Sequence, residues 1–204
     1  MYFFSNYNNL IVIENFIKIF PKYIKNIYYY NKKDILLNLK SNCNENDKNF
    51  KFFFYCLKNF NFFFFKQLID ITVVDFLKKN YRFSIYYTLL SLFNNKNLIF
   101  KFDLISKNNN LIYSINSLND IFKSSIWLER EVWDMYGIFF FNNLDLRRIL
   151  TDYGFKSFPL RKDFPLVGYL ELTFNILTKS LKYINIELNQ NFRKFNFINS
   201  WEVL

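Results

Sequence analysis

Histidine is absent from this chain of 204 residues, and glycine, proline and cysteine are scarce. Without histidine there is no Ser-His or Cys-His pair for nucleophilic catalysis, and no imidazole that titrates near neutral pH. Three scattered glycines cannot form a phosphate-binding or dinucleotide-binding loop. The sequence therefore contains no catalytic constellation, and we expect a chain with no catalytic site of its own.

Only two cysteines are present, Cys43 and Cys56. With no histidine to complete a ligand set, they are too few to hold a structural zinc ion or an iron–sulfur cluster. Their spacing does not rule out a disulfide, although two free thiols in a reducing compartment are the favoured interpretation.

Long apolar runs are also missing, since a membrane-spanning helix needs about 20 apolar residues and the most apolar region, residues 61–77, is interrupted by Lys66 and two aspartates. The N-terminal residues lack the arginine-rich, acid-free pattern of a transit peptide. We expect a soluble protein with no membrane span, made where it works or imported without a cleaved leader. An amphipathic helix over residues 11–24, bent at Pro21, is expected to pack in the core, with a membrane surface as the alternative.

Phenylalanine and tyrosine are abundant instead, at 29 and 15 residues, together with much asparagine, lysine and isoleucine and a net charge of +10. Codons for these amino acids, as a group, are rich in A and T, which indicates an AT-biased genome and fits an organelle. The same bias can explain the lysine excess, so the charge is weak support for an acidic partner.

Alternation of apolar and polar residues and enrichment in branched residues predict strands over residues 34–39, 68–76, 82–93, 98–105 and 170–176. Residues 94–97 would form a hairpin turn and residues 41–49 a variable polar loop. Residues 50–57 are ambiguous between strand and helix.

Two helices are expected after the first strands. Residues 117–120 have capping-box spacing, which predicts a short helix that turns Ile121 and Phe122 inward. A second helix would begin at Ser124 or Ser125. This order indicates an α+β fold, with an antiparallel or mixed sheet and helices packed on one face.

Residues 127–169 hold all three glycines, two of the three prolines and four of the six arginines. The helix-like run 127–136 would end at Gly137 in the left-handed conformation, and residues 138–141 would form a short buried strand. A turn at Asn142 and Asn143 would follow, then one or two helical turns over residues 144–150, closed by Gly154. Residues 158 and 164 precede prolines and should be extended.

Acidic and basic residues balance within this segment: Glu129, Glu131, Asp134, Asp145, Asp152 and Asp163 against Arg130, Arg147, Arg148, Lys156, Arg161 and Lys162. Interleaved arginine and aspartate can order a loop, so a self-contained ion-pair network and a docking surface are both possible. Glu129, Glu131 and Asp134 are also candidates for an acid–base pair, but ion pairing with the nearby arginines is the commoner explanation.

The C-terminal residues, from about 179 to 204, are polar but carry spaced aromatic side chains. Such a tail suits an extended arm on a partner subunit, with Phe192, Phe195 and Trp201 as anchors. The alternative is an edge strand and loop that close the same domain. We therefore expect three parts: an α+β domain over residues 1–126, a looped segment over 127–169 packed on it, and a strand with an extended arm over 170–204.

Three runs, EREVWDMYGI, DLRRILTDYGF and PLRKDFPLVGY, resemble the signature of the thirty-kilodalton subunit of respiratory complex I, the NADH:ubiquinone oxidoreductase. This family has bacterial members and is called subunit 9 where the mitochondrial genome encodes it. Weaker similarity extends to residues 68–76, 82–92 and 190–202 and leaves the first sixty residues outside.

The resemblance implies a structural core subunit of the hydrophilic arm of proton-translocating mitochondrial complex I, peripheral on the matrix side of the inner membrane. It would bind no cofactor, with FMN and iron–sulfur clusters in partner subunits. It would brace the quinone-reducing module by contacts with the large quinone-module subunit and neighbouring iron–sulfur subunits. The candidate docking residues are Glu129, Arg130, Glu131, Trp133, Asp134, Asp145, Arg147, Arg148, Asp152, Arg161, Lys162, Asp163, Phe192, Phe195 and Trp201.

Two departures from the family pattern stand out, because His-Pro and Gly-His usually precede its second and third runs. Here Asn143-Leu144 and Ser157-Phe158 take those places, so a role that needs an imidazole cannot operate. The alternative class is a nucleic-acid-binding or mitochondrial ribosomal protein, favoured by the charge and the aromatic excess. Its basic residues are dispersed, however, and we expect no nucleic-acid partner.

Overall fold

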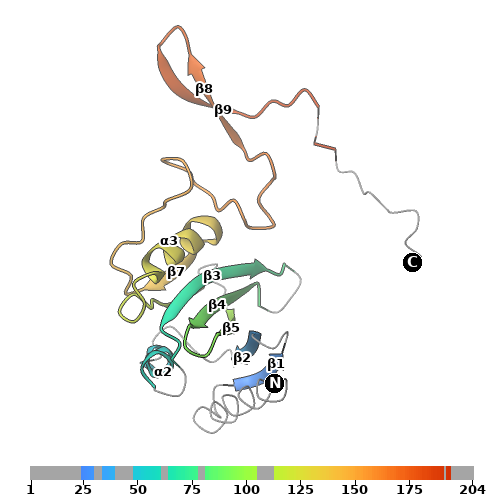
Figure 1. Cartoon of the computed structure of the whole chain (residues 1–204). Helices are drawn as coiled ribbons and strands as arrows, with labels where there is room; N and C mark the ends of the chain where they lie inside the picture. Colours follow the sequence, from blue (N-terminus) through green and yellow to red (C-terminus); the bar gives the residue numbers. More distant parts are fainter. Residues whose placement is uncertain are drawn as a thin grey trace, which may run out of the picture. The chain divides into compact units, whose positions relative to one another are not determined.

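A computed structural model of the chain describes residues 24–29, 34–39, 48–60, 64–77, 81–104, 113–190 and 192–193. Two compact units are present, residues 1–163 and 164–204. The elements, labelled in Figure 1, are β1 (Ile24–Tyr29), β2 (Asp34–Leu39), α2 (Lys48–Asn59), β3 (Gln67–Asp75), β4 (Phe83–Ser91), β5 (Lys96–Leu104), β6 (Tyr113–Asn116), α3 (Ser125–Tyr136), β7 (Ile138–Phe141), β8 (Leu170–Asn175) and β9 (Ser180–Asn185).

The first unit is built on a five-stranded sheet with the order β1-β2-β5-β4-β3. Neighbouring strands are antiparallel except β2 and β5, which are parallel, so the sheet is mixed. The predicted strands 34–39, 68–76, 82–93 and 98–105 are confirmed, as is the hairpin between the last two. Residues 34–39 are not the first strand, however, because β1 precedes them. The helix predicted over residues 11–24 lies outside the described residues, except for Ile24, which begins β1.

One face of this sheet is packed with aromatic side chains from α2. The ring centroids of Phe53 and Phe100 are 5.3 Å apart, and those of Phe50 and Tyr87 are 6.1 Å apart. Phe50, Phe53, Phe54 and Leu57 are buried in α2, a spacing of three and four residues that is typical of one helix face. The ambiguous stretch 50–57 is therefore helical.

Three further elements, β6, β7 and α3, pack beside α2 on the same face of the sheet. Phe83 of β4 packs edge-on against Tyr113 of β6, with centroids 4.8 Å apart, and it also contacts Tyr136 of α3. Phe83 and Tyr87 are four residues apart on one strand, so their side chains share a face. The predicted α+β class, with helices on one face, is confirmed. Figure 1 shows α3 alongside β3, where Ser124 Oγ donates to the Leu68 carbonyl at 3.0 Å.

Helix α3 begins and ends where the sequence predicts. Its first residue is Ser125, and Gly137 follows the last turn with φ 72° and ψ 36°. The Gly137 N–H donates to the carbonyl of Trp133, which closes the helix with a left-handed cap. β7 follows directly and pairs in parallel with β6, as the short strand predicted over residues 138–141.

The short helix predicted from residues 117–120 does not form, and that prediction was wrong. Residues 119–121 make a turn, because the Ser117 N–H that a capping box would use donates instead to the Phe141 carbonyl at 2.8 Å. Asp120 pairs with Lys51 of α2 at 2.6 Å. Ile121 and Phe122 are nevertheless buried, so the turn places both side chains inward as expected.

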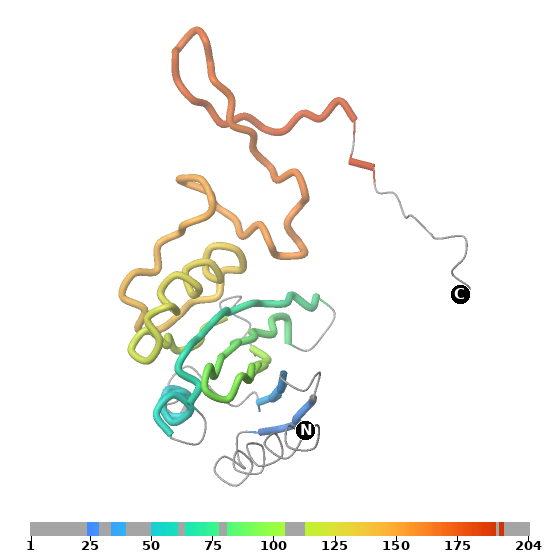
Figure 2. Tube along the Cα trace, in the orientation of Figure 1, coloured from blue at the N-terminus to red at the C-terminus, as the bar shows by residue number. Residues whose placement is uncertain are grey.

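The helical turns predicted over residues 144–150 are also absent, and Gly154 closes no helix. Figure 2 shows the irregular path of the chain beyond α3. The N–H groups of Ile149, Leu150 and Thr151 donate to the side chain of Asp134, so a carboxylate takes the place of the helical carbonyl acceptors. The turn at Asn142, which has φ 62°, is confirmed.

The second unit contains a hairpin of β8 and β9, paired from Leu170↔Asn185 to Asn175↔Ser180. The predicted strand over residues 170–176 is confirmed. The tail expected to be an extended arm from residue 179 begins with a strand, β9, whereas the alternative interpretation had an edge strand that closes the same domain. β9 pairs with β8 in a separate two-stranded sheet, so it does not extend the five-stranded sheet. Of the two cysteines, Cys56 is buried and free, and Cys43 lies outside the described residues.

Candidate partner-docking site

Asp134, in the last half of α3, holds the loop that follows β7. Its side chain is 0% exposed. Oδ2 accepts hydrogen bonds from the N–H groups of Ile149, Leu150 and Thr151 at 3.1, 2.7 and 3.0 Å, and Oδ1 accepts one from Thr151 Oγ1 at 2.7 Å. One carboxylate thus replaces the ladder of hydrogen bonds that an irregular segment lacks.

The ionisation of Asp134 follows from these contacts. Burial raises the pKa of the carboxyl group, but the hydrogen bonds from Thr151 and from the three backbone N–H groups favour the charged form more strongly and lower the pKa below its usual range. Arg148 Nη1 lies 3.6 Å from Oδ1 and pairs with the carboxylate. Asp134 is therefore an ionised anchor of the loop.

Glu129, one turn earlier in α3, is also 0% exposed and joins three segments of the chain. Its Oε1 accepts the Leu118 N–H at 2.8 Å, from the turn after β6. Its Oε2 accepts Asn143 Nδ2 at 2.9 Å, from the turn after β7. Asn143, which stands where the family pattern has histidine, therefore supplies a neutral N–H donor to a buried carboxyl group.

Burial, more than hydrogen bonding, sets the ionisation of Glu129. Desolvation raises the pKa of the carboxyl group to about 7, and hydrogen bonds from Leu118, Ser117, Asn143 and Ser125 lower it only in part. The nearby titratable group on the sheet is Tyr87, whose pKa is raised by burial and also by the charge of Glu129. Glu129 can therefore change its protonation state near neutral pH.

We expect Glu129→Gln to remove a pH dependence of stability. The folded chain holds the Glu129 proton to about pH 7, whereas the unfolded chain releases it near 4.5, so the stability from this group is complete below pH 4.5 and is lost as the pH rises through 7. The free energy of unfolding of the wild type should fall by about 3 kcal/mol relative to the variant over that range. Urea unfolding at pH 4.5, 6 and 8 measures the difference. A constant offset between the two proteins would contradict the assignment.

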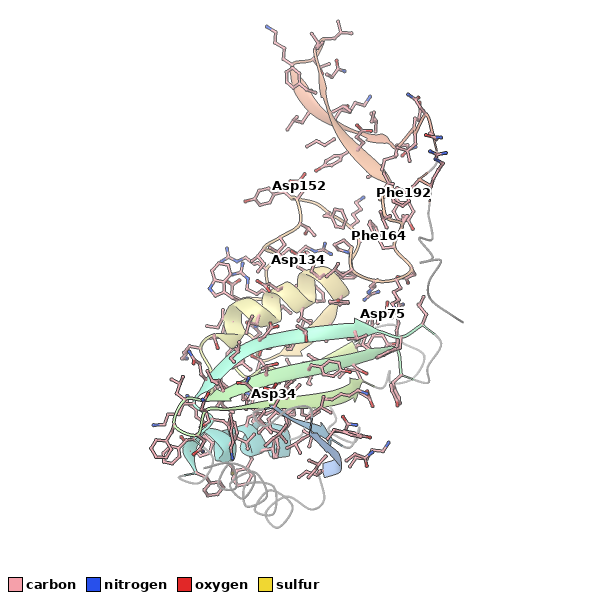
Figure 3. All side chains as sticks on the ribbon, turned by 45° about the vertical axis from the view of Figure 1, so that its right-hand side comes forward. Asp34, Asp75, Asp134, Asp152, Phe164 and Phe192 are labelled. Atoms are coloured by element: carbon pink, nitrogen blue, oxygen red, sulfur yellow. The ribbon has the colours of Figure 1, made fainter. Side chains whose placement is uncertain are left out.

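A third buried carboxylate, Asp75 at the end of β3, anchors the PLRKD run. Figure 3 labels its position on the sheet. Arg82 Nε and Nη2 donate to the two oxygens of Asp75, each at 3.0 Å, and the Lys162 N–H donates to Oδ2 at 2.9 Å. Arg82 also contacts Asp163 at 2.8 Å. The hydrogen bond with Asp75, more than that with Asp163, raises the pKa of Arg82. The contacts of the Lys162 N–H with Asp75 and of Asp163 with Arg82 fix residues 162–163 against the sheet.

Arg161 ties the same run to the end of α3. Its Nε donates to the Tyr136 carbonyl at 2.6 Å, and its guanidinium stacks on the ring of Phe158, 4.4 Å from the centroid. Arg148 lies 4.9 Å from that centroid, and Trp133 packs against the ring at 5.6 Å. Phe158, which departs from the family pattern, is therefore held between two arginines and a tryptophan.

Arg130, Asp145 and Arg147 form a third group. Arg147 Nε and Nη2 donate to Asp145 at 2.6 and 2.7 Å, and Arg130 Nε donates to the Arg147 carbonyl at 3.0 Å. The guanidinium of Arg130 also stacks on Trp127, 4.9 Å from the ring centroid. The Arg147–Asp145 pair is close to the surface, where such pairs add little stability, so its main effect is to fix the shape of the loop.

The structure thus brings most of the predicted site residues together as a frame within the first unit. Glu129 and Asp134 are buried, and all the arginines of the set use acceptors in that unit. Glu131, Asp152, Lys162 and Asp163 are exposed and Trp133 is partly buried. Phe192 lies in the second unit and is exposed; Phe195 and Trp201 lie outside the described residues.

Large apolar side chains at the surface of this frame were missed by the sequence reasoning. Leu144 is 99% exposed, Tyr153 is 96% exposed, and Leu150 lies between them in the chain and is also exposed. A loop fixed by hydrogen bonds presents them without further ordering, which lowers the entropic cost of binding. Their signal in the sequence was weak, because the expected helix over residues 144–150 would have turned some of them inward.

The hairpin of the second unit has one apolar face and one polar face. Residues directly opposite each other on paired strands share a face, so the register puts Leu170, Leu172, Phe174, Leu181 and Tyr183 together. All five are exposed. The opposite face carries Glu171, Thr173, Asn175, Ser180 and Lys182, with Ile184 as its one large apolar residue. Leu170, Leu172, Phe174 and Leu181 thus form an apolar surface of the second unit.

Two further features are absent from the ranges that the structure describes. No group of three or more Cys, Asp or Glu side chains that could hold a metal ion is present among the described residues. Nor does any helix in those ranges have the length and apolar character needed to cross a membrane.

Sequence comparisons identify the family. Residues 46–170 match the family model of the respiratory-chain NADH dehydrogenase 30 kDa subunit. NADH-ubiquinone oxidoreductase subunit 9 of Reclinomonas americana is 40% identical over 186 residues, which cover 91% of this chain and 85% of the relative. A bacterial relative, an NADH-quinone oxidoreductase subunit of Paramagnetospirillum magneticum, is 45% identical over 138 residues, covering 68% of this chain and 67% of the relative.

Comparisons with solved structures support the fold alone. A chain of the membrane-bound sulfane sulfur reductase, an archaeal respiratory membrane complex, matches with a TM-score of 0.63 at 19% identity, over 78% of this chain and 86% of that chain. A trypsin-resistant fragment of Nqo5 matches with a TM-score of 0.50 at 20% identity, over 68% and 99%. The sequence matches have higher identity, and from them we conclude that the chain belongs to the family of the 30 kDa subunit of respiratory-chain NADH dehydrogenase, complex I.

Proposed function

We propose that this chain is a structural subunit of mitochondrial complex I that braces the quinone-reducing module and binds no cofactor itself. As a complex I subunit, its partners are other subunits of that complex. More specifically, the chain would contact the large quinone-module subunit and the neighbouring iron–sulfur subunits. Those iron–sulfur subunits would carry the iron–sulfur clusters, and FMN would be bound elsewhere in the complex. It would sit on the matrix side of the inner membrane.

The observation that carries this proposal is the open apolar face of the β8–β9 hairpin. A two-stranded hairpin is marginally stable in water by itself, because it cannot cover its own apolar side chains. Here Phe174 and Leu181 lie opposite each other on that face, and both are exposed. Five large side chains on one side of two strands favour a partner protein as their cover.

The charged side chains of the first unit bond mainly to one another and to the backbone, which favours a bracing role and not catalysis or nucleic-acid binding. Arg82, Arg148 and Arg161 bond to acceptors in their own unit, so they are not a free basic patch for phosphates. The buried carboxylates Asp75 and Asp134 hold loop backbone. These groups would keep a rigid surface, including Leu144 and Tyr153, ready for neighbouring subunits.

A mitochondrial setting is favoured by the relatives and by the composition. Subunit 9 proteins of Reclinomonas americana and Acanthamoeba castellanii match at 40% and 46% identity, and the chain is rich in amino acids with AT-rich codons. The bacterial relative matches at a similar identity of 45%, so identity alone does not separate the two settings. The mitochondrial location is therefore a part of the proposal.

Native electrophoresis of mitochondrial membranes tests the function. The membranes are solubilised in mild detergent, stained for NADH dehydrogenase activity, and the active band is analysed by mass spectrometry. We expect this chain in the band, in an amount equal to that of the other core subunits. Migration with ribosomes, or as a free protein, would contradict the proposal.

Two substitutions on β9 test the role of the hairpin. We expect Leu181→Lys, on the apolar face, to lower the amount of this chain in the active band about tenfold or more, because a desolvated unpaired charge costs several kcal/mol. Ser180→Lys, on the adjacent polar face, is the matched control and should assemble normally. Equal assembly of both variants would show that the apolar face is not a docking surface.

A further inference from the structure

The hydrogen-bond partners of Glu129 lie on two sides of its carboxyl group, one deep in the first unit and one near its surface. On the deep side, Leu118 is 0% exposed and donates its N–H to Oε1 at 2.8 Å. The Leu118 carbonyl accepts the N–H groups of Ile121 and Phe122 at 2.9 and 2.8 Å, and both of these side chains belong to the hydrophobic core. A movement on this side would therefore disturb the core.

On the surface side, Asn143 binds Glu129 and the start of the loop at the same time. Its Nδ2 donates to Oε2 of Glu129 at 2.9 Å, and its Oδ1 accepts the Asp145 N–H at 3.1 Å, which closes an Asx turn. Asn143 is half-buried, and Asn142 and Leu144 on either side of it are exposed. A movement of Asn143 alone would thus bring water to the carboxyl group and release the Asp145 N–H.

The charged groups around Glu129 do not replace this water. On the sheet, Tyr87 is the titratable group that the charge of Glu129 affects, and β6 and β7 contain no charged residue. Charged residues of α2, β3, α3 and the loops have other partners: Lys51 with Asp120, Lys58 with the Ile121 carbonyl, Asp75 with Arg82, Arg130 with the Arg147 carbonyl, and Asp145 with Arg147. An ionised Glu129 therefore depends on hydrogen bonds and on water.

Burial favours the neutral form of Glu129, and water favours its carboxylate. Burial raises the pKa of Glu129 from 4.5 to about 7 in the closed structure, in which Asn143 is bonded to it. If water reached the group at Asn143, the pKa would return toward its ordinary value. By linkage, opening at Asn143 becomes more favourable as the pH rises from about 4.5 to about 7, and it changes little above that.

We propose that ionisation of Glu129 opens the turn at Asn143 and releases the start of the loop, while the Leu118 side stays closed. Glu129 and Asn143 thus form a pH-sensitive latch. The proton leaves to solvent, the carboxylate gains water in place of Asn143 Nδ2, and the Asp145 N–H loses its acceptor. Leu144, which is 99% exposed, moves with the turn. The latch belongs to the folded chain itself and does not depend on the partners proposed above.

Hydrogen exchange of the full chain, followed by NMR at single amides, tests the latch. The Asp145 rate is measured at about pH 5, 6 and 7 and divided by the rate in Glu129→Gln at the same pH, which cancels the pH dependence of the exchange chemistry. We expect this ratio to rise about tenfold or more over that range. A ratio that stays constant or falls would mean that the ionised carboxylate keeps its bond to Asn143, and it would overturn the proposal.

A low concentration of urea separates opening of the turn from unfolding of the chain. Local opening exposes little surface, so the Asp145 rate at about pH 7 should change less than about twofold in about 1 M urea, whereas the Leu118 rate should rise. Equal rises at the two amides would show that Asn143 opens only when the chain unfolds, and would refute the latch.

Asn143→Ala keeps the test decisive if Glu129→Gln does not fold. In this variant the Asp145 N–H has lost its acceptor at every pH, so it should exchange faster than in the wild type at about pH 5. The difference between the two proteins should narrow about tenfold or more by about pH 7, because the wild-type turn then opens as well. A difference that is constant with pH would contradict the latch.

Discussion

Replacing Asp134 with alanine should lower the free energy of unfolding by about 3 kcal/mol. The substitution removes the acceptor of three backbone N–H groups, at 3.1, 2.7 and 3.0 Å, and of the Thr151 hydroxyl. It also leaves the Arg148 guanidinium without a carboxylate that now lies 3.6 Å away. For a chain of this size the melting temperature should fall by about 10 °C, measured by thermal unfolding followed by circular dichroism.

Glu131→Ala is the matched control for this substitution. Glu131 lies on the same helix and carries the same charge, but its side chain is exposed, so its loss should change stability by about 0.5 kcal/mol or less. If both variants melt with the wild type, Asp134 does not hold the loop. If Asp134→Ala melts normally but fails to assemble, its carboxylate acts on a partner instead.

Gly137→Ala should be the second large effect, with a loss of about 3 kcal/mol. Gly137 has φ 72°, where an alanine is strained. A Cβ there would also lie 2.5 Å from Arg161 Nη2 and 2.6 Å from the ring of Phe158. Because Arg161 is bonded to the Tyr136 carbonyl and stacked on Phe158, neither group can move without losing a contact.

Gly154→Ala separates the two contributions. Gly154 has a similar φ of 77°, but no atom beyond Gly154 and its two chain neighbours lies within 4 Å of the position that an added methyl group would take, so it should show only the backbone strain, about 1 kcal/mol. Chemical unfolding of both variants in urea gives the difference. Equal losses would mean that the stack of Arg161 and Phe158 yields without cost, and the anchoring ascribed to it would then be wrong.

The central sheet followed from the sequence because its strands alternate buried and exposed residues. β5 is the clearest case: Phe100 and Phe102 are buried and Lys101 between them is not. The same local patterns failed at residues 117–120 and 144–150. At the second of these, the acceptor of the backbone N–H groups is Asp134, up to 17 residues away, and local spacing cannot reveal a contact of that kind.

The kinds of contact in the candidate site were predictable from its residue types, but which of its side chains point into the protein was not. The balance of arginine and aspartate within residues 127–169 indicated an ion-pair network, and Asp145–Arg147 and Asp134–Arg148 are pairs of that kind. Burial of Glu129 was not foreseen, although Ser125, Glu129 and Val132 are all buried in α3 at positions four and seven residues from the first. That spacing is typical of an inward helix face and is the signal that was available.

The hairpin was missed because its turn contains neither glycine nor proline. Lys179 adopts φ 48°, and the Leu177 N–H donates to Asn175 Oδ1 at 3.0 Å, an Asx turn that starts the reversal. Asn175 was therefore the available cue. Once paired, the two strands put their apolar residues on one side.

The central claim has two parts: contacts within the first unit hold its own loop, and the second unit is stabilised by binding to other subunits. Hydrogen exchange of the full chain, free in solution and within purified complex I, tests both parts most directly. We expect the amides of residues 149–151 to be protected in both states, because Asp134 holds them. The amides of β8 and β9 should exchange rapidly in the free chain and become protected only in the complex. Protection of β9 in the free chain, or of residues 149–151 only in the complex, would contradict this division.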